Sequence, residues 1–269
     1  MSNLTTDAVV TLRDIDVAYT EAGSGSPVVL VHGLAEDRST WAVQQRDLDD
    51  VHTFAYDLRG HGASTLGDAD ASLAQLGRDL LAFLEEVTGP ATVVGFSLGG
   101  TVALWAAAER PDLVTQTVVV GTSSVVGRAA IGFYADRIAR AADTASTEFR
   151  TALRDDTAAA ITVAHDRLDD VVAARLAAVG DGRGYTNAAR DMASLHEAPL
   201  TRRLADVPTH VDVVGATGDT FCPAKAAAII TDALPDVTYH EIPNAGHLMN
   251  IDNPDAVTAV LRTALSGRN

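Results

Sequence analysis

Short apolar runs alternate with helical patterns along the first half of the chain. Residues 28–32 (VVLVH) are aliphatic and β-branched without polar alternation, as in a strand covered on both faces. Residues 91–96 and 114–121 have a similar character, and residues 51–56 form a weaker run of the same kind. Between the runs at residues 51–56 and 91–96, apolar residues recur every three or four positions from residue 72 to 87, which predicts an amphipathic helix. The alternation is typical of parallel strands joined by helices.

This order of elements predicts an α/β fold with a mostly parallel, doubly wound sheet and right-handed crossovers. Residues 8–13 and 16–21 alternate apolar and polar positions more regularly, which predicts an antiparallel pair at one edge of the sheet. Strand and helix patterns resume near the end of the chain, in the order strand 210–215, helix 225–234, strand 237–242 and helix 254–265.

The middle of the chain has a different composition. Residues 125–200 are rich in Ala, Arg and Asp, with helical periodicity and no strand-like run. A separate all-α domain is one interpretation, but strands of a single predicted sheet lie on both sides of the segment. We therefore predict an α/β core made of residues 1–124 and 201–269, with residues 125–200 forming a helical cap over the carboxyl edge of the sheet.

Charge and cysteine content narrow the classes of function. The 269 residues carry a formal net charge of −16 at pH 7, which disfavours binding to nucleic acid or to an anionic membrane surface. Cys222 is the only cysteine, so neither an intrachain disulfide nor a cysteine-rich metal site is expected. We see no signal peptide and no apolar run of about 18 residues. A cytoplasmic location is therefore expected.

Residues 95–99 read Gly-Phe-Ser-Leu-Gly, a G-x-S-x-G pattern at the junction between a predicted strand and a predicted helix. A serine there must turn sharply, so Gly95, Gly99 and Gly100 supply room for the backbone. The N-terminus of the helix that follows favours the negative charge that develops near the serine. We interpret Ser97 as a catalytic nucleophile, against the simpler interpretation of a serine that caps a helix.

A serine nucleophile needs a base and an acid that orients the base. His247 follows the predicted strand 237–242 in a turn at the same edge of the sheet, whereas His165 and His196 fall in the cap and His240 lies within a strand. We therefore predict His247 as the general base.

Asp219 follows the predicted strand 210–215 and is the predicted acid, although a turn or helix-capping aspartate would look the same. Asp212 lies within that strand and Asp232 on the next helix. The loop after strand 114–121 has no carboxylate to serve instead. Two backbone amides, those of Leu34 and Leu98, are the predicted oxyanion hole.

Together these motifs resemble the α/β-hydrolase superfamily over nearly the whole chain. The matching segments are residues 32–33 (HG), 57–62 (DLRGHG), 95–100 (GFSLGG), 215–219 (GATGD) and 246–247 (GH). Within the superfamily, residues 57–62 and 246–254 resemble 3-oxoadipate enol-lactonases, small bacterial carboxylesterases and cofactor-free haloperoxidase-type esterases. The resemblance implies an eight-stranded sheet, a cap over the site, and neither a metal nor an organic cofactor.

The function expected from these motifs is hydrolysis of a small-molecule ester or lactone through an acyl-enzyme. A carbon–carbon hydrolase of the meta-cleavage-product type is an alternative, disfavoured because Leu-Ala-Glu-Asp follows His32-Gly33 where such enzymes are richer in glycine. A protein of the same fold that binds a ligand without catalysis is a second alternative. The oligomeric state stays open, with a homo-oligomer among the options.

Candidates for the substrate pocket, each of which could equally be ordinary core, are Trp41, Phe96, Phe133, Tyr134 and Leu248. Arg38 and Arg128 could bind a substrate carboxylate, although solvated surface arginines are the simpler interpretation.

Overall fold

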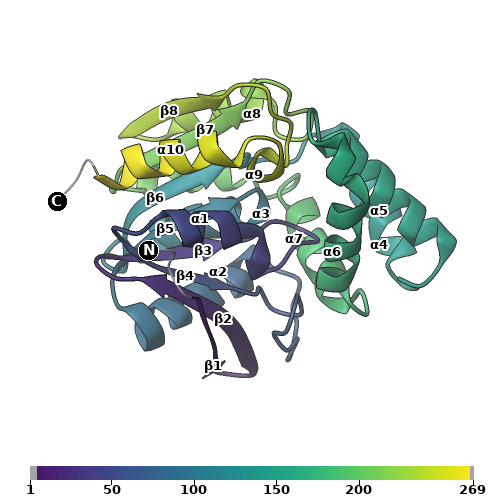
Figure 1. The fold of residues 1–269 in the computed structure, drawn as a ribbon, viewed down its shortest axis with the longest axis horizontal. Coiled ribbons are helices and arrows are strands. Elements are labelled where there is room, and N and C mark those ends of the chain that lie inside the picture. The colour runs from purple at the N-terminus through teal and green to yellow at the C-terminus, as the bar shows by residue number, and fades with distance from the viewer. Residues whose placement is uncertain (1–4, 267–269) are drawn as a thin grey trace.

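The computed structural model describes residues 5–266, and over these residues the chain forms one eight-stranded sheet in the order β1-β2-β4-β3-β5-β6-β7-β8 (Figure 1). The strands are β1 (Thr6–Leu12), β2 (Ile15–Gly23), β3 (Pro27–Val31), β4 (His52–Tyr56), β5 (Ala91–Phe96), β6 (Val114–Val120), β7 (Val211–Ala216) and β8 (Val237–Ile242). β2 pairs antiparallel with β1 and with β4, and every other pairing is parallel. The predicted fold class is confirmed.

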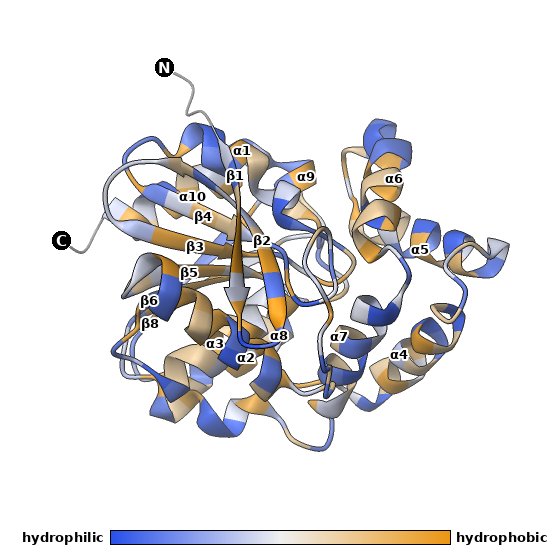
Figure 2. Cartoon of the chain, turned by 90° about the horizontal axis from the view of Figure 1, so that it is seen from below, coloured by the Kyte–Doolittle hydropathy of each residue, from blue (hydrophilic) through white to orange (hydrophobic). Residues whose placement is uncertain are grey.

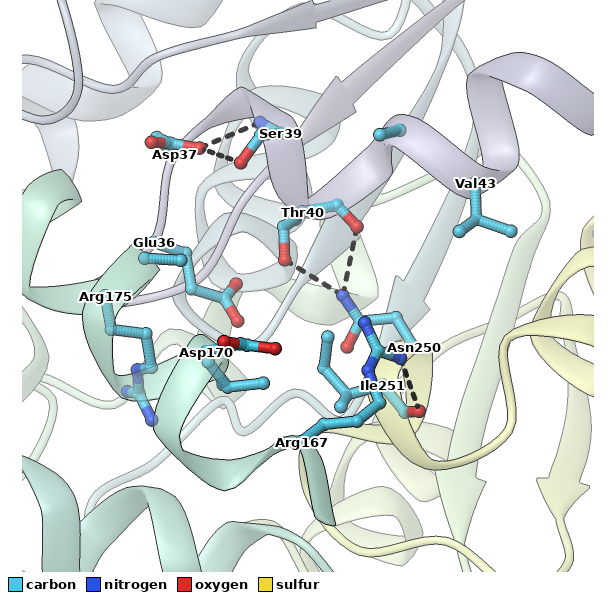
Figure 3. Close-up of a pocket in the computed structure, with 13 residues that line it drawn as sticks. Glu36, Asp37, Ser39, Thr40, Val43, Arg167, Asp170, Arg175, Asn250 and Ile251 are labelled. Carbon is cyan, nitrogen blue, oxygen red and sulfur yellow. Dashed lines mark hydrogen bonds between the residues drawn. The ribbon is translucent and has the colours of Figure 1, made fainter. Parts of the chain in front are cut away.

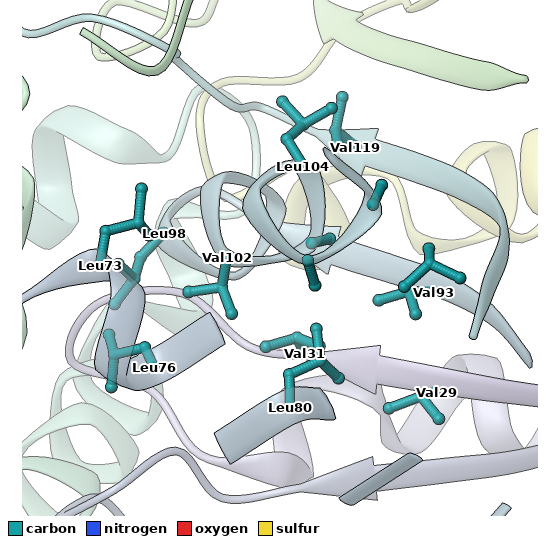
Figure 4. Close-up of a cluster of buried hydrophobic side chains, with 14 of the residues drawn as sticks. Val29, Val31, Leu73, Leu76, Leu80, Val93, Leu98, Val102, Leu104 and Val119 are labelled. Atoms are coloured by element: carbon teal, nitrogen blue, oxygen red, sulfur yellow. The ribbon is translucent and has the colours of Figure 1, made fainter. Parts of the chain in front are cut away.

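Helices cover both faces of the sheet. Those of the core are α1 (Ala42–Asp47), α2 (Leu73–Phe83), α3 (Leu98–Glu109), α8 (Ala224–Ala233), α9 (Met249–Asp252) and α10 (Pro254–Ser266). Val29 and Val31 of β3 belong to the buried cluster shared with α2 and α3, part of which is shown in Figure 4. Val28 and Leu30 belong to the cluster shared with α10 on the opposite face. The unbroken apolar run in β3 is thus explained by burial on both sides.

Helix α2, which connects β4 to β5, begins where the sequence predicts. The Ser72 side chain accepts a hydrogen bond from the Gln75 amide (3.2 Å), which caps the N-terminus of α2. The helix continues as a π-helical turn, Leu84–Thr88, and ends at Gly89, whose φ is +69°. None of the helices within the described part of the chain is long and apolar enough to span a membrane.

Four helices separate β6 from β7 in sequence and gather on one side of the molecule in Figures 1 and 2. They are α4 (Arg128–Arg140), α5 (Thr147–Ala160), α6 (Leu168–Val179) and α7 (Arg183–Ser194), and we call them the cap. Figure 2 shows hydrophobic and hydrophilic positions alternating along them. Their shared buried cluster includes Phe149, Leu153 and Tyr185 from the cap and Ala35 from the core. The exact division of the chain at residues 125 and 200 stays a prediction.

Candidate active site

Ser97 occupies the single residue between β5 and α3, in a backbone conformation that is unusual for a non-glycine residue. Its φ is +51° and its ψ is −115°. The turn is held by a hydrogen bond from the Ser97 amide to the carbonyl of Val120 at the end of β6 (2.8 Å). A strained, left-handed serine at a strand–helix junction costs on the order of 1–3 kcal/mol and is maintained only by its surroundings.

The glycines around Ser97 are required by close packing of the backbone. A Cβ atom on Gly95 would lie 2.3 Å from the Gly99 carbonyl oxygen and 2.4 Å from the Gly100 nitrogen. A Cβ on Gly100 would lie 2.0 Å from the hydroxyl oxygen of Thr122. All three distances are far below van der Waals contact, so the turn that carries Ser97 excludes side chains at these positions.

Two residues from distant loops form a hydrogen-bonded series with Ser97. The Nε2 atom of His247 lies 3.1 Å from the Ser97 Oγ, and its Nδ1 atom lies 2.9 Å from Asp219 Oδ2. Asp219 is 5% exposed, and its other carboxylate oxygen accepts hydrogen bonds from the amides of Phe221 and Cys222 (2.9 and 2.8 Å). With the ring hydrogen on Nδ1, His247 donates to Asp219 and its Nε2 is left to accept the serine hydroxyl.

The other histidines and aspartates considered from the sequence lie elsewhere. His240 Nε2 pairs with Asp212 Oδ1 at 2.8 Å, between neighbouring strands β7 and β8. His196 lies 3.0 Å from the Val126 carbonyl, and Asp232 is exposed on α8. These side chains are engaged locally or face solvent, so the structure brings together only the three residues that the motifs singled out.

Two phenyl rings lie against the imidazole of His247. The ring centroid of Phe96 is 5.1 Å from that of His247, and the centroid of Phe221 is 5.3 Å away. Phe133 of α4 contacts Phe221 edge-on, with centroids 6.2 Å apart. These contacts restrict the rotation of the imidazole and place an apolar surface beside it.

The loop after β3 is fixed by His32. The Nδ1–H of His32 donates to the Gly33 carbonyl (2.8 Å) while its Nε2 accepts from the Leu58 amide (2.9 Å). Complete burial lowers the pKa of His32 to about 4, so its ring is neutral near pH 7. Since the Gly33–Leu34 peptide is trans, the Leu34 N–H points away from the anchored carbonyl. His32 thus orients the amide that the sequence assigns to an oxyanion hole.

A cavity of about 270 Å³ opens beside Ser97 and His247. Its wall includes four of the residues that the sequence proposed for a pocket, namely Phe96, Phe133, Tyr134 and Leu248. Trp41 is a correction, because it is completely buried in the apolar cluster that also holds Leu30 and Leu261. The 3-10 turn Arg38–Trp41 places the indole in the core and away from the cavity.

Several residues of the cavity wall were not predicted from the sequence. Those that the motifs missed include Asp156, Arg175, Tyr185, Met192, Phe221 and Cys222. Four of them lie on cap helices, where any residue of a periodic pattern can face the core, the cavity or solvent. Phe221 and Cys222 follow Asp219 closely, and this proximity is the only signal that could have found them.

The two arginines proposed for a substrate carboxylate lie outside this cavity. Arg38 forms an ion pair with the buried carboxylate of Asp57 and another with Asp7 (3.2 Å). Arg128 is exposed at the first turn of α4. Among residues 5–266, no group of three or more His, Cys, Asp or Glu side chains is arranged to hold a metal ion.

A second cavity, of about 260 Å³, lies between α6 and the core elements η1 (Arg38–Trp41), α1 and α9 (Figure 3). Glu36 is 6% exposed, and burial raises the pKa of its carboxyl group. Asn250 is 4% exposed and donates to the Thr40 hydroxyl (2.9 Å). Arg175 lines this cavity as well as the one beside Ser97.

The chain is similar to known proteins over most of its length. The model of the alpha/beta hydrolase family matches residues 28–260, which is most of the chain. This protein belongs to the alpha/beta hydrolase family.

This hydrolase has an enol-lactonase among its relatives and another among the solved structures that share its fold. It is 25% identical to 3-oxoadipate enol-lactonase 2 of Acinetobacter baylyi over 97% of each chain. The crystal structure of an enol-lactonase from Burkholderia xenovorans superposes with a TM-score of 0.86 at 23% identity, covering 96% of this chain and 100% of that one. The 2-hydroxy-6-oxo-6-phenylhexa-2,4-dienoate hydrolase of a Rhodococcus strain gives a TM-score of 0.83 at 18% identity, over 99% and 100% of the chains.

Proposed function

We propose that this hydrolase cleaves a carboxylic ester or lactone through an acyl-enzyme formed on Ser97. The observation that carries the proposal is the continuous hydrogen-bonded series from Ser97 through His247 to Asp219, at the wall of a mainly apolar cavity. A nucleophile, a base and an acid within hydrogen-bond reach are the requirements of this chemistry.

In the first half-reaction, Ser97 Oγ attacks the substrate carbonyl carbon while Nε2 of His247 accepts the hydroxyl proton. The amides of Leu34 and Leu98 are proposed to donate to the oxyanion that forms, and the N-terminus of α3 adds a favourable dipole. When the intermediate collapses, the carbon–oxygen bond to the alkoxide breaks and His247 returns its proton to that alkoxide.

In the second half-reaction, His247 removes a proton from water, and the resulting hydroxide attacks the acyl carbonyl. The ester bond to Ser97 breaks, and the serine oxygen recovers its proton from His247. The carboxylate of Asp219 stabilises the imidazolium in both steps. With a lactone, both products are parts of one hydroxy acid.

The wall of the cavity favours a small substrate with an apolar acyl or alcohol part. Aromatic and aliphatic side chains dominate it, with a few polar groups such as Tyr134, Asp156 and Arg175. The net charge of −16 disfavours anionic substrates. The enol-lactonase relative supports the inclusion of lactones among the substrates to be tested.

The test is a comparison of wild-type protein, Ser97→Ala and the exposed control Ser194→Ala with p-nitrophenyl butyrate, a lactone panel and a meta-cleavage-product ketone. We expect ester or lactone turnover in the wild type and the control and none in Ser97→Ala. A fluorophosphonate should label the peptide that contains Ser97. Turnover that survives in Ser97→Ala would exclude the mechanism, and exclusive turnover of the ketone would show a carbon–carbon hydrolase.

A further inference from the structure

The loop that carries the Leu34 amide is held by the cap as well as by the core. Ala35 is completely buried and belongs to the cluster that includes Phe149, Leu153 and Tyr185 of the cap. Its φ is +61°, in the left-handed region that non-glycine residues rarely adopt. The loop therefore depends on contacts outside itself to keep this conformation.

Arg175 of α6 supplies polar contacts to this loop. Its Nη2 group donates to the Leu34 carbonyl (3.3 Å) and its Nε group to the Ala35 carbonyl (3.4 Å). Its Nη1 group donates to the hydroxyl of Thr157 on α5 (3.1 Å), which in turn donates to the Leu153 carbonyl (2.6 Å). The planar guanidinium thus joins two cap helices to two successive carbonyls of the loop.

The same loop is also held by Glu36. The Gly33 amide donates to Glu36 Oε2 at 3.1 Å, and Glu36 is almost completely buried. Figure 3 shows the Glu36 carboxylate directed toward the centre of the second cavity and the guanidinium of Arg175 directed away from it. Arg175 therefore approaches the loop from the side of the cap, in the wall shared by the two cavities.

We propose that Arg175 is a positioning residue that holds the Leu34–Ala35 segment in the conformation needed for the oxyanion hole. This proposal rests on the proposed function, because it concerns the Leu34 amide as an oxyanion donor. The cap thereby contributes to the rate of the chemical step in addition to forming the cavity wall.

Two observations favour positioning over capture of a substrate carboxylate. Three of the five N–H groups of Arg175 are directed at protein acceptors, two of which are carbonyls that water would otherwise have to satisfy. The peptide that each carbonyl belongs to is adjacent to the strained residue Ala35. A small displacement of this segment moves the Leu34 N–H, and oxyanion stabilisation is sensitive to displacements of about 1 Å.

The experiment compares Arg175→Met and Arg175→Lys with the exposed control Arg150→Met, using p-nitrophenyl butyrate as a neutral substrate. For Arg175→Met we expect kcat to fall about 10- to 100-fold with KM changed less than about twofold. Inhibition by a trifluoromethyl ketone, whose serine adduct carries an oxyanion, should weaken by the same factor as kcat/KM. Arg175→Lys keeps the charge but lacks the fork, so it should recover only part of the loss.

An unchanged kcat in Arg175→Met would overturn this role. A rise in KM for anionic esters alone would also overturn it, because it would mean that Arg175 binds the substrate. Thermal unfolding of the variant is measured in parallel. Weaker trifluoromethyl ketone binding with an unchanged unfolding temperature would show lost positioning and not lost stability.

Fluorophosphonate labelling separates the two proposals. If the wild type is not labelled at Ser97, the proposed function itself fails. If the wild type is labelled and Arg175→Met is labelled at an equal rate, only the role of Arg175 fails. Labelling that is slower in Arg175→Met and normal in Arg150→Met supports both.

Discussion

The Nε2 atom of His247 lies 3.1 Å from the Oγ atom of Ser97, although 150 positions separate the two residues in the chain. This proximity arises because β5 and β8 belong to one sheet and the loops at their carboxyl ends lie at the same edge. Ser97 therefore has a base within hydrogen-bond reach, and Asp219 orients the imidazole ring of that base.

Asp219→Asn should lower kcat by about 10⁴-fold without loss of the fold. Asp219 Oδ1 accepts from two backbone amides, so an asparagine would keep its carbonyl oxygen there and turn its NH₂ group toward His247. The histidine would then carry its hydrogen on Nε2 and could not accept from Ser97. Ester turnover and thermal unfolding are measured together, with exposed Asp232→Asn as the control. Activity within about tenfold of wild type would contradict the role of Asp219.

Gly95→Ala and Gly132→Ala should shift stability in opposite directions. A Cβ on Gly95 would meet backbone atoms at 2.3–2.4 Å, so the strand–helix turn must be displaced and unfolding should become easier. Gly132 lies within α4 with no atom near the added Cβ, and alanine there should stabilise the helix by about 1 kcal/mol. Urea unfolding of both variants provides the measurement. Equal midpoints for Gly95→Ala and wild type would contradict the packing argument.

Asp191→Asn should remove a pH dependence of stability. Asp191 is completely buried on α7, neither of its carboxylate oxygens has a partner among the described residues, and burial raises its pKa to about 8. Between about pH 4 and pH 8 the native state holds a proton that the unfolded chain has released, so stability falls as pH rises.

Urea midpoints for wild type, Asp191→Asn and the exposed control Asp155→Asn are compared at pH 5 and pH 8. The wild type and the control should lose more stability at pH 8 than the Asp191→Asn variant does. The same loss in all three proteins would mean that Asp191 is ionised in the native state.

Phe221→Ala should raise KM for aromatic esters more than for acetate esters. Phe221 is 38% exposed, lines the cavity and lies against both His247 and Phe133, so its removal opens the apolar wall. A contribution of about 1–3 kcal/mol to substrate binding corresponds to a change of roughly tenfold or more in KM. Tyr239→Ala, which removes an exposed aromatic ring on β8, serves as the control. A uniform loss in kcat with unchanged KM would show that Phe221 acts on His247 instead.

The strands, most core helices and the positions of Ser97, His247 and Asp219 could be predicted because their signals are local. Residues 91–96 and 237–242 coincide with β5 and β8, where unbroken or strand-like patterns are bounded by turn residues. The short elements η1 and α1 were not predicted, since six or fewer residues show too little periodicity. Trp41 illustrates the same limit, because an apolar residue in a loop has the same appearance whether it lines a cavity or completes a core.

The sequence by itself determined the α/β architecture and the three residues of the candidate site, since backbone periodicity and turn geometry depend on near neighbours in the chain. Only the tertiary structure decided which side chains surround Ser97 and which residues hold the Leu34 amide in place. Arg175 is the clearest case, because its acceptors on Leu34 and Ala35 lie 141 and 140 positions away. Such contacts are selected by the packing of the cap on the core, and no local pattern encodes them.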